Sequence, residues 1–184
     1  MTIRTGSGAD AREYTINFND HRNDGSIHYF PVTVIDLDNR DYPESPLRFQ
    51  SRNTGRYAVF LSQGLRIGTS RDSLLPAEAI DLAIFNATVG SVACYAVHCA
   101  KDRKFEVSLR VSSDQENTLA QLAIELYLDG EIAATFNATS TGGDQNWVST
   151  SSYPVEFKQG FHTLELRWKS NGLNVSRINL TPVQ

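Results

Sequence analysis

Trp147 and Asn174, both near the C-terminus, are the side chains whose types and surroundings best suit ligand recognition. Trp147 follows a polar run over residues 142–146, and Asn174 comes two residues after Gly172. An indole ring can lie flat on the C–H face of a sugar ring, and a carboxamide both donates to and accepts from hydroxyl groups. The two residues therefore predict one wall and the floor of a sugar-binding cleft, provided that the Trp147 ring is uncovered. By periodicity alone, Trp147 can equally cap the edge of a sheet or face solvent.

Motifs for catalysis are absent from the sequence. The four histidines (His21, His28, His98 and His162) show none of the HExxH, HxH or paired Cys/His spacings of metal sites, so each is expected in a structural or surface role. No GxSxG motif is present for a serine nucleophile. Glycoside hydrolysis needs a pair of acids across a sugar, and nothing singles out such a pair among the 21 acidic residues. We therefore expect a binding protein and not an enzyme.

Charge and hydropathy restrict the partners. The net charge of -4 disfavours nucleic acid, whose backbone requires a basic footprint. No apolar run approaches the roughly 18 residues of a membrane-spanning helix. The first 13 residues show no apolar segment of a signal peptide. The expected protein is a monomer that contacts neither membrane nor nucleic acid.

The elements that must position Trp147 and Asn174 are mostly β-strands, judged from the sequence pattern. Residues 105–111 and 163–168 alternate apolar with polar positions, and Trp168 falls on the apolar face, in the core. Asp129-Gly130 predicts a two-residue hairpin turn, and 23–25, 53–55 and 171–172 predict further turns. Residues 75–85 give the one plausible helical turn. The pattern predicts a two-sheet antiparallel β-sandwich as a single domain over 13–184, with 1–12 as a flexible leader or an added tail.

The two cysteines, Cys94 and Cys99, fall in one predicted strand. Five extended residues span roughly 16 Å, whereas the Cα atoms of a disulfide lie within about 7 Å of each other. Their odd separation also places them on opposite faces of the strand. We therefore predict two free and mostly buried thiols.

The C-terminal half resembles a known family. Residues 142–180 carry Gly-Gly-x-Gln-x-Trp, Gly-x-His-Thr-Leu-x-Leu and Gly-x-Asn, and residues 90–113 and 122–136 match a strand pair and an Asp-Gly hairpin. This order is similar to that of family 6 carbohydrate-binding modules over about 90–181, with family 35 modules as close competitors. The resemblance implies a jelly-roll sandwich whose end loops hold a sugar between two aromatic residues. It assigns ligand binding to Trp147, Asn174, Phe85 and Asn86.

The resemblance also implies a structural calcium ion. The family's N-terminal glutamate pair is replaced here by Asn17 and Asn19, which weakens a site for a hard cation, and Asp20 or Asp144 could compensate. The family's last-strand tryptophan is Arg177 here. The resemblance implies a secreted or extracellular accessory domain, tethered to a catalytic domain and binding a poly- or oligosaccharide. The alternative is a structural or protein-interaction sandwich that has lost sugar binding.

Overall fold

The computed structural model describes residues 2–5, 12–15, 34–37, 47–48, 58–71, 81–116 and 121–183, and regular structure in these ranges consists of strands only. No helix in them is long and apolar enough to cross a membrane. The strands are β1 Thr2–Thr5, β2 Arg12–Thr15, β3 Val34–Asp36, β4 Leu47–Arg48, β5 Ala58–Leu61, β6 Arg66–Ser70, β7 Asp81–Phe85, β8 Val92–Cys99, β9 Arg103–Ser113, β10 Leu122–Leu128, β11 Glu131–Ala138, β12 Gly143–Ser149, β13 Tyr153–Phe157, β14 Gly160–Trp168 and β15 Asn174–Pro182.

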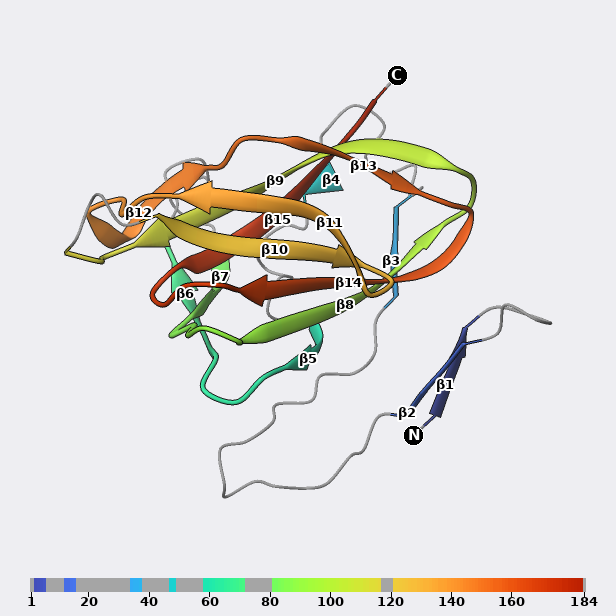
Figure 1. Cartoon of the computed structure of the whole chain (residues 1–184), viewed down its shortest axis with the longest axis horizontal. Helices are drawn as coiled ribbons and strands as arrows, with labels where there is room; N and C mark the ends of the chain where they lie inside the picture. The colour runs from blue at the N-terminus through green and yellow to red at the C-terminus, as the bar shows by residue number, and fades with distance from the viewer. Residues whose placement is uncertain are drawn as a thin grey trace.

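Strands β3 to β15 form two facing sheets, which confirms the predicted β-sandwich (Figure 1). A six-stranded sheet has the order β11-β10-β14-β8-β3, with β5 also paired to β8. A seven-stranded sheet has the order β12-β9-β15-β7-β6, with β13 on β9 and β4 on β15. Every pairing is antiparallel except that of β3 with β8. Because sequential neighbours such as β8 and β9 lie in different sheets, the chain crosses the sandwich repeatedly, as in a jelly roll.

The core lies between the sheets, where the predicted alternation places it. In β9, Phe105, Val107 and Leu109 are fully buried, and in β14 Leu164, Leu166 and Trp168 face them from the other sheet. Each such side chain contributes about 1.5–3 kcal/mol by leaving water. The indole Nε1–H of Trp168 donates to the Leu173 carbonyl at 2.6 Å. Trp168 is thus a core residue, as predicted, and it also fixes the chain just before Asn174.

The hairpin turn at Asp129-Gly130 is confirmed. Asp129 has φ 53° and Gly130 φ 90°, both in the left-handed region that a type I′ turn requires. The turn joins β10 to β11, which pair along their full lengths with one bulge. The predicted turns at 23–25 and 53–55 lie outside the described residues.

The helical turn expected over 75–85 is wrong where the structure describes this segment. Residues 81–85 form β7, which pairs with β6 from Ser70 opposite Asp81 to Arg66 opposite Phe85. Ala83, Ile84 and Phe85 are buried in succession, so this strand is covered on both faces and lacks the alternation of a half-buried strand. A short apolar run of this kind does not distinguish strand from helix by periodicity.

The N-terminal leader expected over 1–12 contains a strand. β1 pairs with β2 as a separate two-stranded sheet, from Thr2 opposite Thr15 to Thr5 opposite Arg12. The domain boundary predicted at residue 13 therefore falls inside β2.

Cys94 and Cys99 are free thiols on opposite faces of β8, as predicted, with Cys99 buried and Cys94 half-buried. Burial, and secondarily the charge of Glu165, raises the pKa of the Cys94 thiol to about 12, although Arg167 opposes this. Because this pKa exceeds that of an unfolded thiol, about 8.5, the contribution of Cys94 to stability is present below pH 8.5 and is lost as the pH rises toward 12.

Native cysteine reactivity should reflect this burial. At pH 8, alkylation by iodoacetamide should be at least about a hundredfold slower for the folded protein than for the chain in urea, because the thiolate is the nucleophile. Mass spectrometry after timed quenching measures the rate. Rapid modification of Cys94 without unfolding would contradict the burial described here.

Candidate functional site

The stretch Asp144–Trp147 of β12 leaves its partner strand and crosses one end of the sandwich. Gly143 is paired with Ser113 and Val148 with Val111, so four residues of β12 lie opposite the single residue Ser112 of β9. We call this stretch, Asp144 to Trp147, the strap. The polar turn predicted before Trp147 is therefore part of an interrupted strand, and the interruption frees its side chains to reach across the sheet.

The first anchor of the strap is Asp144. Ser112 Oγ donates to the Asp144 carbonyl at 2.6 Å, and the Asn174 Nδ2 amide donates to the Asp144 Oδ1 carboxylate at 2.7 Å. Asn174 Nδ2 also lies 3.3 Å from Ser112 Oγ. Asn174 is only 3 % exposed. The amide predicted to bind sugar hydroxyl groups is therefore engaged inside the protein, at the start of β15.

The second anchor is Gln145, which reaches the opposite edge of the seven-stranded sheet. Its Oε1 atom accepts from the Arg71 amide at 2.8 Å, and its Nε2 atom donates to the Thr69 carbonyl at 3.4 Å. Thr69 and Arg71 lie on either side of Ser70 at the end of β6. Because β12 and β6 are the two edge strands of this sheet, the Gln145 side chain connects its two edges at this end. Its function was not predicted, although it is part of the Gly-Gly-x-Gln-x-Trp motif.

Trp147 and Phe85 lie together, but in a closed arrangement. Their ring centroids are 6.0 Å apart at an interplanar angle of 70°, and Ala83 completes the cluster. Trp147 is 7 % exposed and Phe85 4 % exposed. A sugar held between two rings needs about 7 to 8 Å between parallel planes, twice a van der Waals contact of ~3.5–4 Å. The uncovered indole expected from the sequence is therefore wrong for this structure.

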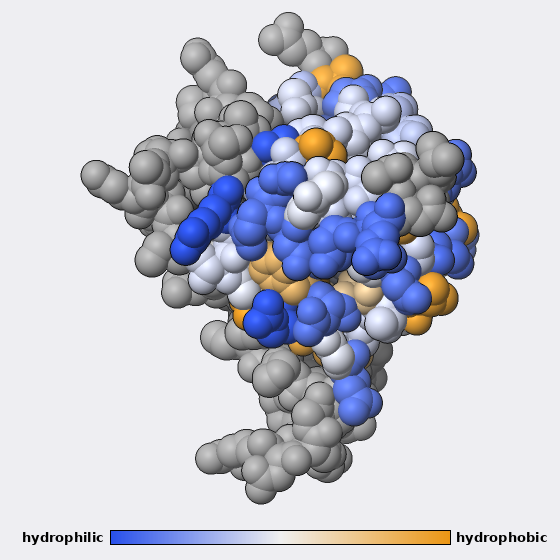
Figure 2. Space-filling model, turned by 90° about the vertical axis from the view of Figure 1, so that its left-hand side faces the viewer, coloured by the Kyte–Doolittle hydropathy of each residue, from blue (hydrophilic) through white to orange (hydrophobic). Residues whose placement is uncertain are grey.

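Other groups complete the surroundings of Phe85. The Arg66 guanidinium carbon lies 5.7 Å from the ring centroid, and a Cβ atom at Gly68 would come within 3.0 Å of Phe85 Cδ2. Glycine at position 68 therefore leaves room for the ring. The surface at this end of the sandwich is mainly hydrophilic, and no broad apolar area is visible on it (Figure 2).

Asn86 stands beside the aromatic pair and is exposed. Its φ of 61° places it in the left-handed region, which asparagine tolerates better than most residues. The loop after it packs on the turn before Asn174, because Gly172 N donates to the Ala87 carbonyl and Val89 N donates to Asn171 Oδ1, both at 2.9 Å. The four predicted ligand residues thus gather at one end of the sandwich.

The predicted calcium ligands are only partly described. Asn17, Asn19 and Asp20 lie outside the described residues. Asp144 is exposed and its Oδ1 atom accepts from Asn174. Within the described ranges, no three His, Cys, Asp or Glu side chains gather closely enough to hold a metal ion.

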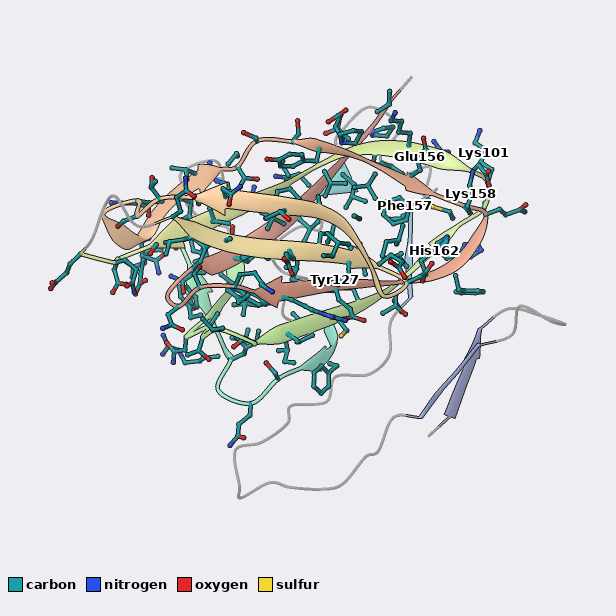
Figure 3. The ribbon with its side chains drawn as sticks, viewed as in Figure 1. Lys101, Tyr127, Glu156, Phe157, Lys158 and His162 are labelled. Carbon is teal, nitrogen blue, oxygen red and sulfur yellow. The ribbon has the colours of Figure 1, made fainter. Side chains whose placement is uncertain are left out.

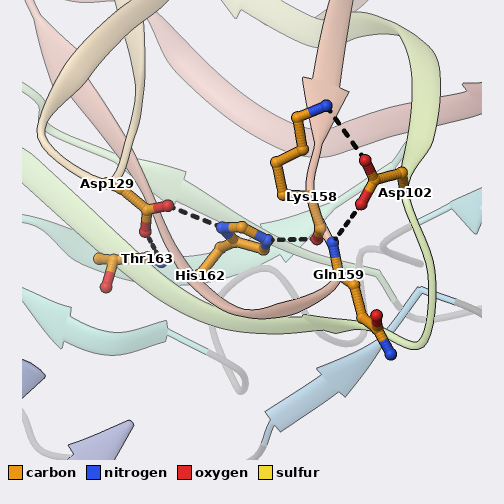
Figure 4. A network of polar contacts seen from close by, with 6 residues as sticks. All are labelled: Asp102, Asp129, Lys158, Gln159, His162 and Thr163. Atoms are coloured by element: carbon orange, nitrogen blue, oxygen red, sulfur yellow. Dashed lines mark hydrogen bonds and ion pairs between the residues drawn. The ribbon is translucent and has the colours of Figure 1, made fainter. Parts of the chain in front are cut away.

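His162 lies at the other end of the sandwich, near Lys158 and Phe157 (Figure 3). Its Nδ1 atom lies 2.7 Å from Asp129 Oδ2 and its Nε2 atom 2.6 Å from the Lys158 carbonyl, while Thr163 N donates to Asp129 Oδ1 at 2.9 Å (Figure 4). The network ties the β10–β11 turn to the loop before β14. This role is structural, as expected for the histidines, although its partners could not be predicted from spacing.

The family of the chain follows from its sequence match. The model of carbohydrate binding module family 6 matches residues 72–182, which include Phe85, the whole strap and Asn174. This chain belongs to that family. The match covers more than half of the protein, so the resemblance over the C-terminal half is confirmed.

Individual relatives agree with this assignment. A cycloisomaltooligosaccharide glucanotransferase of Niallia circulans is 31% identical over 97 residues, which cover 51% of this chain but only 9% of that enzyme. A family 6 module of lichenase 5A from Cellvibrio mixtus, solved with cellotriose, has a TM-score of 0.59 and 18% identity over 77% of this chain and 100% of that chain. A family 35 module from Clostridium thermocellum has a TM-score of 0.57 and 15% identity over 74% and 98%. At these identities the structural matches show the shared fold, which families 6 and 35 have in common.

Proposed function

We propose that this protein binds a poly- or oligosaccharide at the strap end of the sandwich and catalyses no reaction. The observation that carries the proposal is that one strap packs Trp147 on Phe85 and bonds to Asn174 through Asp144, within the segment that matches a carbohydrate-binding family. Aromatic rings supply apolar contact to the sugar, and the Asn174 amide with the Asp144 carboxylate supplies donors and acceptors for hydroxyl groups. Asn86 adds an exposed amide beside Phe85.

We further propose that the protein is an accessory domain of a larger secreted enzyme that acts on glycans. The chain spans only 9% of the glucanotransferase it matches, so the matching region is a small part of that enzyme. A binding module tethered to a catalytic domain raises the effective concentration of substrate without itself turning it over. The proposed partners are therefore a carbohydrate and a tethered catalytic domain.

A second function is favoured by one observation, the burial of Trp147 and Asn174. A structural or protein-interaction sandwich that has lost sugar binding would keep both side chains covered, as they are here. Iodide quenching of tryptophan fluorescence discriminates between the two. Trp168 is fully buried, so a change in iodide quenching when a carbohydrate is added reports on Trp147 and favours the first function, and no change with any carbohydrate of the array favours the second.

Replacing Trp147 by alanine should weaken carbohydrate binding about 5- to 150-fold, because a stacked ring contributes on the order of 1–3 kcal/mol by analogy with base stacking. A glycan array identifies the ligand, and isothermal titration calorimetry measures the loss. Val148→Ala is the matched control, since Val148 lies next to Trp147 on β12 and is 43% exposed. Equal binding by Trp147→Ala and the wild type would remove Trp147 from the site.

We also propose a structural calcium ion bound through Asn17, Asn19 and Asp20, on the strength of the family pattern. The same array repeated with a chelator tests whether the ion supports binding. The thermal unfolding midpoint with and without chelator tests whether it supports the fold. A midpoint that does not change on chelation would contradict the proposal.

A further inference from the structure

Two polar atoms at the candidate site are buried and have no hydrogen-bond partner within the described part of the chain: the indole Nε1–H of Trp147 and the Ser70 hydroxyl. Ser70 is 1% exposed and Trp147 7% exposed. Buried donors and acceptors in native proteins are nearly always paired, so each exception calls for an explanation. The contrast with Trp168 is direct, because its Nε1–H has the Leu173 carbonyl as acceptor.

Both atoms belong to the same face of the seven-stranded sheet. Along β6, Ser70 shares a face with Gly68 and Arg66, and both of these contact the Phe85 ring. Phe85 in turn packs against Trp147. The two backbone bonds of Gln145 lie immediately before and after Ser70. The unpaired hydroxyl and the unpaired indole N–H are therefore held on the same part of the sheet by the strap.

Beyond the Asp144 anchor, few polar contacts hold the strap over Phe85. The Phe85–Trp147 pair is a single edge-to-face contact, and the hydrogen bonds of Gln145 are exposed to solvent. The free-energy cost of leaving two buried polar groups without partners acts against these contacts and disfavours the closed form. A ligand that offered a partner to each group would recover that cost when it bound, and would thereby favour an open form.

We propose that the carbohydrate separates the Phe85 and Trp147 rings, accepts a hydrogen bond from Trp147 Nε1, and takes Ser70 Oγ as a second polar partner. This inference rests on the proposed function and adds which part of the Trp147 indole ring the sugar contacts. Trp147 acts through the edge of its indole ring as well as through its face, and specificity depends on a sugar hydroxyl at that edge.

The test uses Trp147→benzothienylalanine, in which a sulfur atom replaces the indole N–H and the shape of the ring is kept. Cellotriose and isomaltotriose serve as soluble probes by isothermal titration calorimetry, together with the glycan array. We expect about 3- to 10-fold weaker binding, as one lost hydrogen bond would give. The unfolding midpoint without ligand should be unchanged or higher, because an unpaired donor has been removed. Ser70→Ala should behave in the same way.

The outcomes separate this inference from the proposed function. A wild-type protein that binds no glycan on the array would overturn both. A wild-type protein that binds, with unchanged affinity in both variants, would overturn the inference alone. A lower midpoint without ligand in Trp147→benzothienylalanine would also overturn it, because the N–H would then have a partner in the free protein.

Gln145→Ala provides an independent arm. If the strap must move, removing its bonds to Thr69 and Arg71 should strengthen binding about 2- to 5-fold, because less of the protein is held in the closed form. The Trp147 emission maximum should shift to longer wavelength on binding in the wild type. Weaker binding by Gln145→Ala, with no shift in emission, would show that the closed arrangement is itself the binding form.

Discussion

Replacing Trp168 by alanine is expected to lower the free energy of unfolding by about 3–5 kcal/mol, the largest effect of any single substitution considered for this protein. Trp168 is fully buried in β14 among the side chains of both sheets. Alanine would leave a cavity and would strip the Leu173 carbonyl of its donor. Urea unfolding followed by circular dichroism measures the change, since the fluorescence of Trp168 is itself removed.

Trp168→Phe separates the two contributions. It keeps most of the ring but removes the N–H that bonds to Leu173, and should cost about 1–3 kcal/mol as an unsatisfied buried acceptor does. Because Leu173 immediately precedes Asn174, this variant should also weaken carbohydrate binding. A Trp168→Phe protein as stable as the wild type would show that the hydrogen bond to Leu173 contributes nothing.

Replacing His162 by phenylalanine should lower the free energy of unfolding by about 1–3 kcal/mol, as the loss of hydrogen bonds to a carboxylate and a carbonyl does. The two ring nitrogens of His162 face the Asp129 carboxylate and the Lys158 carbonyl. A carbonyl oxygen is always a hydrogen-bond acceptor, and an ionised carboxylate is an acceptor only. The His162 side chain is 9% exposed. Phenylalanine would therefore leave two acceptors facing a hydrocarbon ring, although it could keep the edge-to-face contact with Phe157.

Lys158→Ala is the matched control for His162. The Lys158 ammonium pairs with Asp102 at 3.1 Å, but both side chains are more than half exposed, and such pairs contribute little. The Lys158 carbonyl remains in this variant, so the bond to His162 is kept. We expect His162→Phe to lose far more stability than Lys158→Ala and to retain carbohydrate affinity, because the His162 network lies at the opposite end of the sandwich. Comparable losses in the two variants would contradict the network described here.

Much of the fold could be predicted from the sequence because its strands are locally consistent. Residues 105–111 and 163–168 lie in strands, as predicted, and the Asp129-Gly130 turn has the expected backbone angles. Alternation records which face is buried, and a type I′ turn requires particular residues. β7 was missed because burial on both faces removes the alternation. β12 was missed because its pairing is interrupted at the strap.

The sequence named residues for the candidate site but not their geometry. Phe85, Trp147, Asn174 and Asn86 were expected at one end of the sandwich, and they lie there. The contacts of Asp144 and Gln145, the edge-to-face packing of Phe85 on Trp147 and the two unpaired polar atoms were not expected. Each depends on residues 30 or more positions apart in the chain, which local patterns do not relate.

The sequence alone determined an all-β sandwich with free thiols, the family to which it belongs and the end at which a ligand should be sought. These follow from local periodicity, turn chemistry and short motifs. Only the tertiary structure decided whether the indole of Trp147 is open or covered, because exposure depends on which distant side chains pack against a ring. Here Phe85 packs against it and Gln145 anchors the strap that carries it.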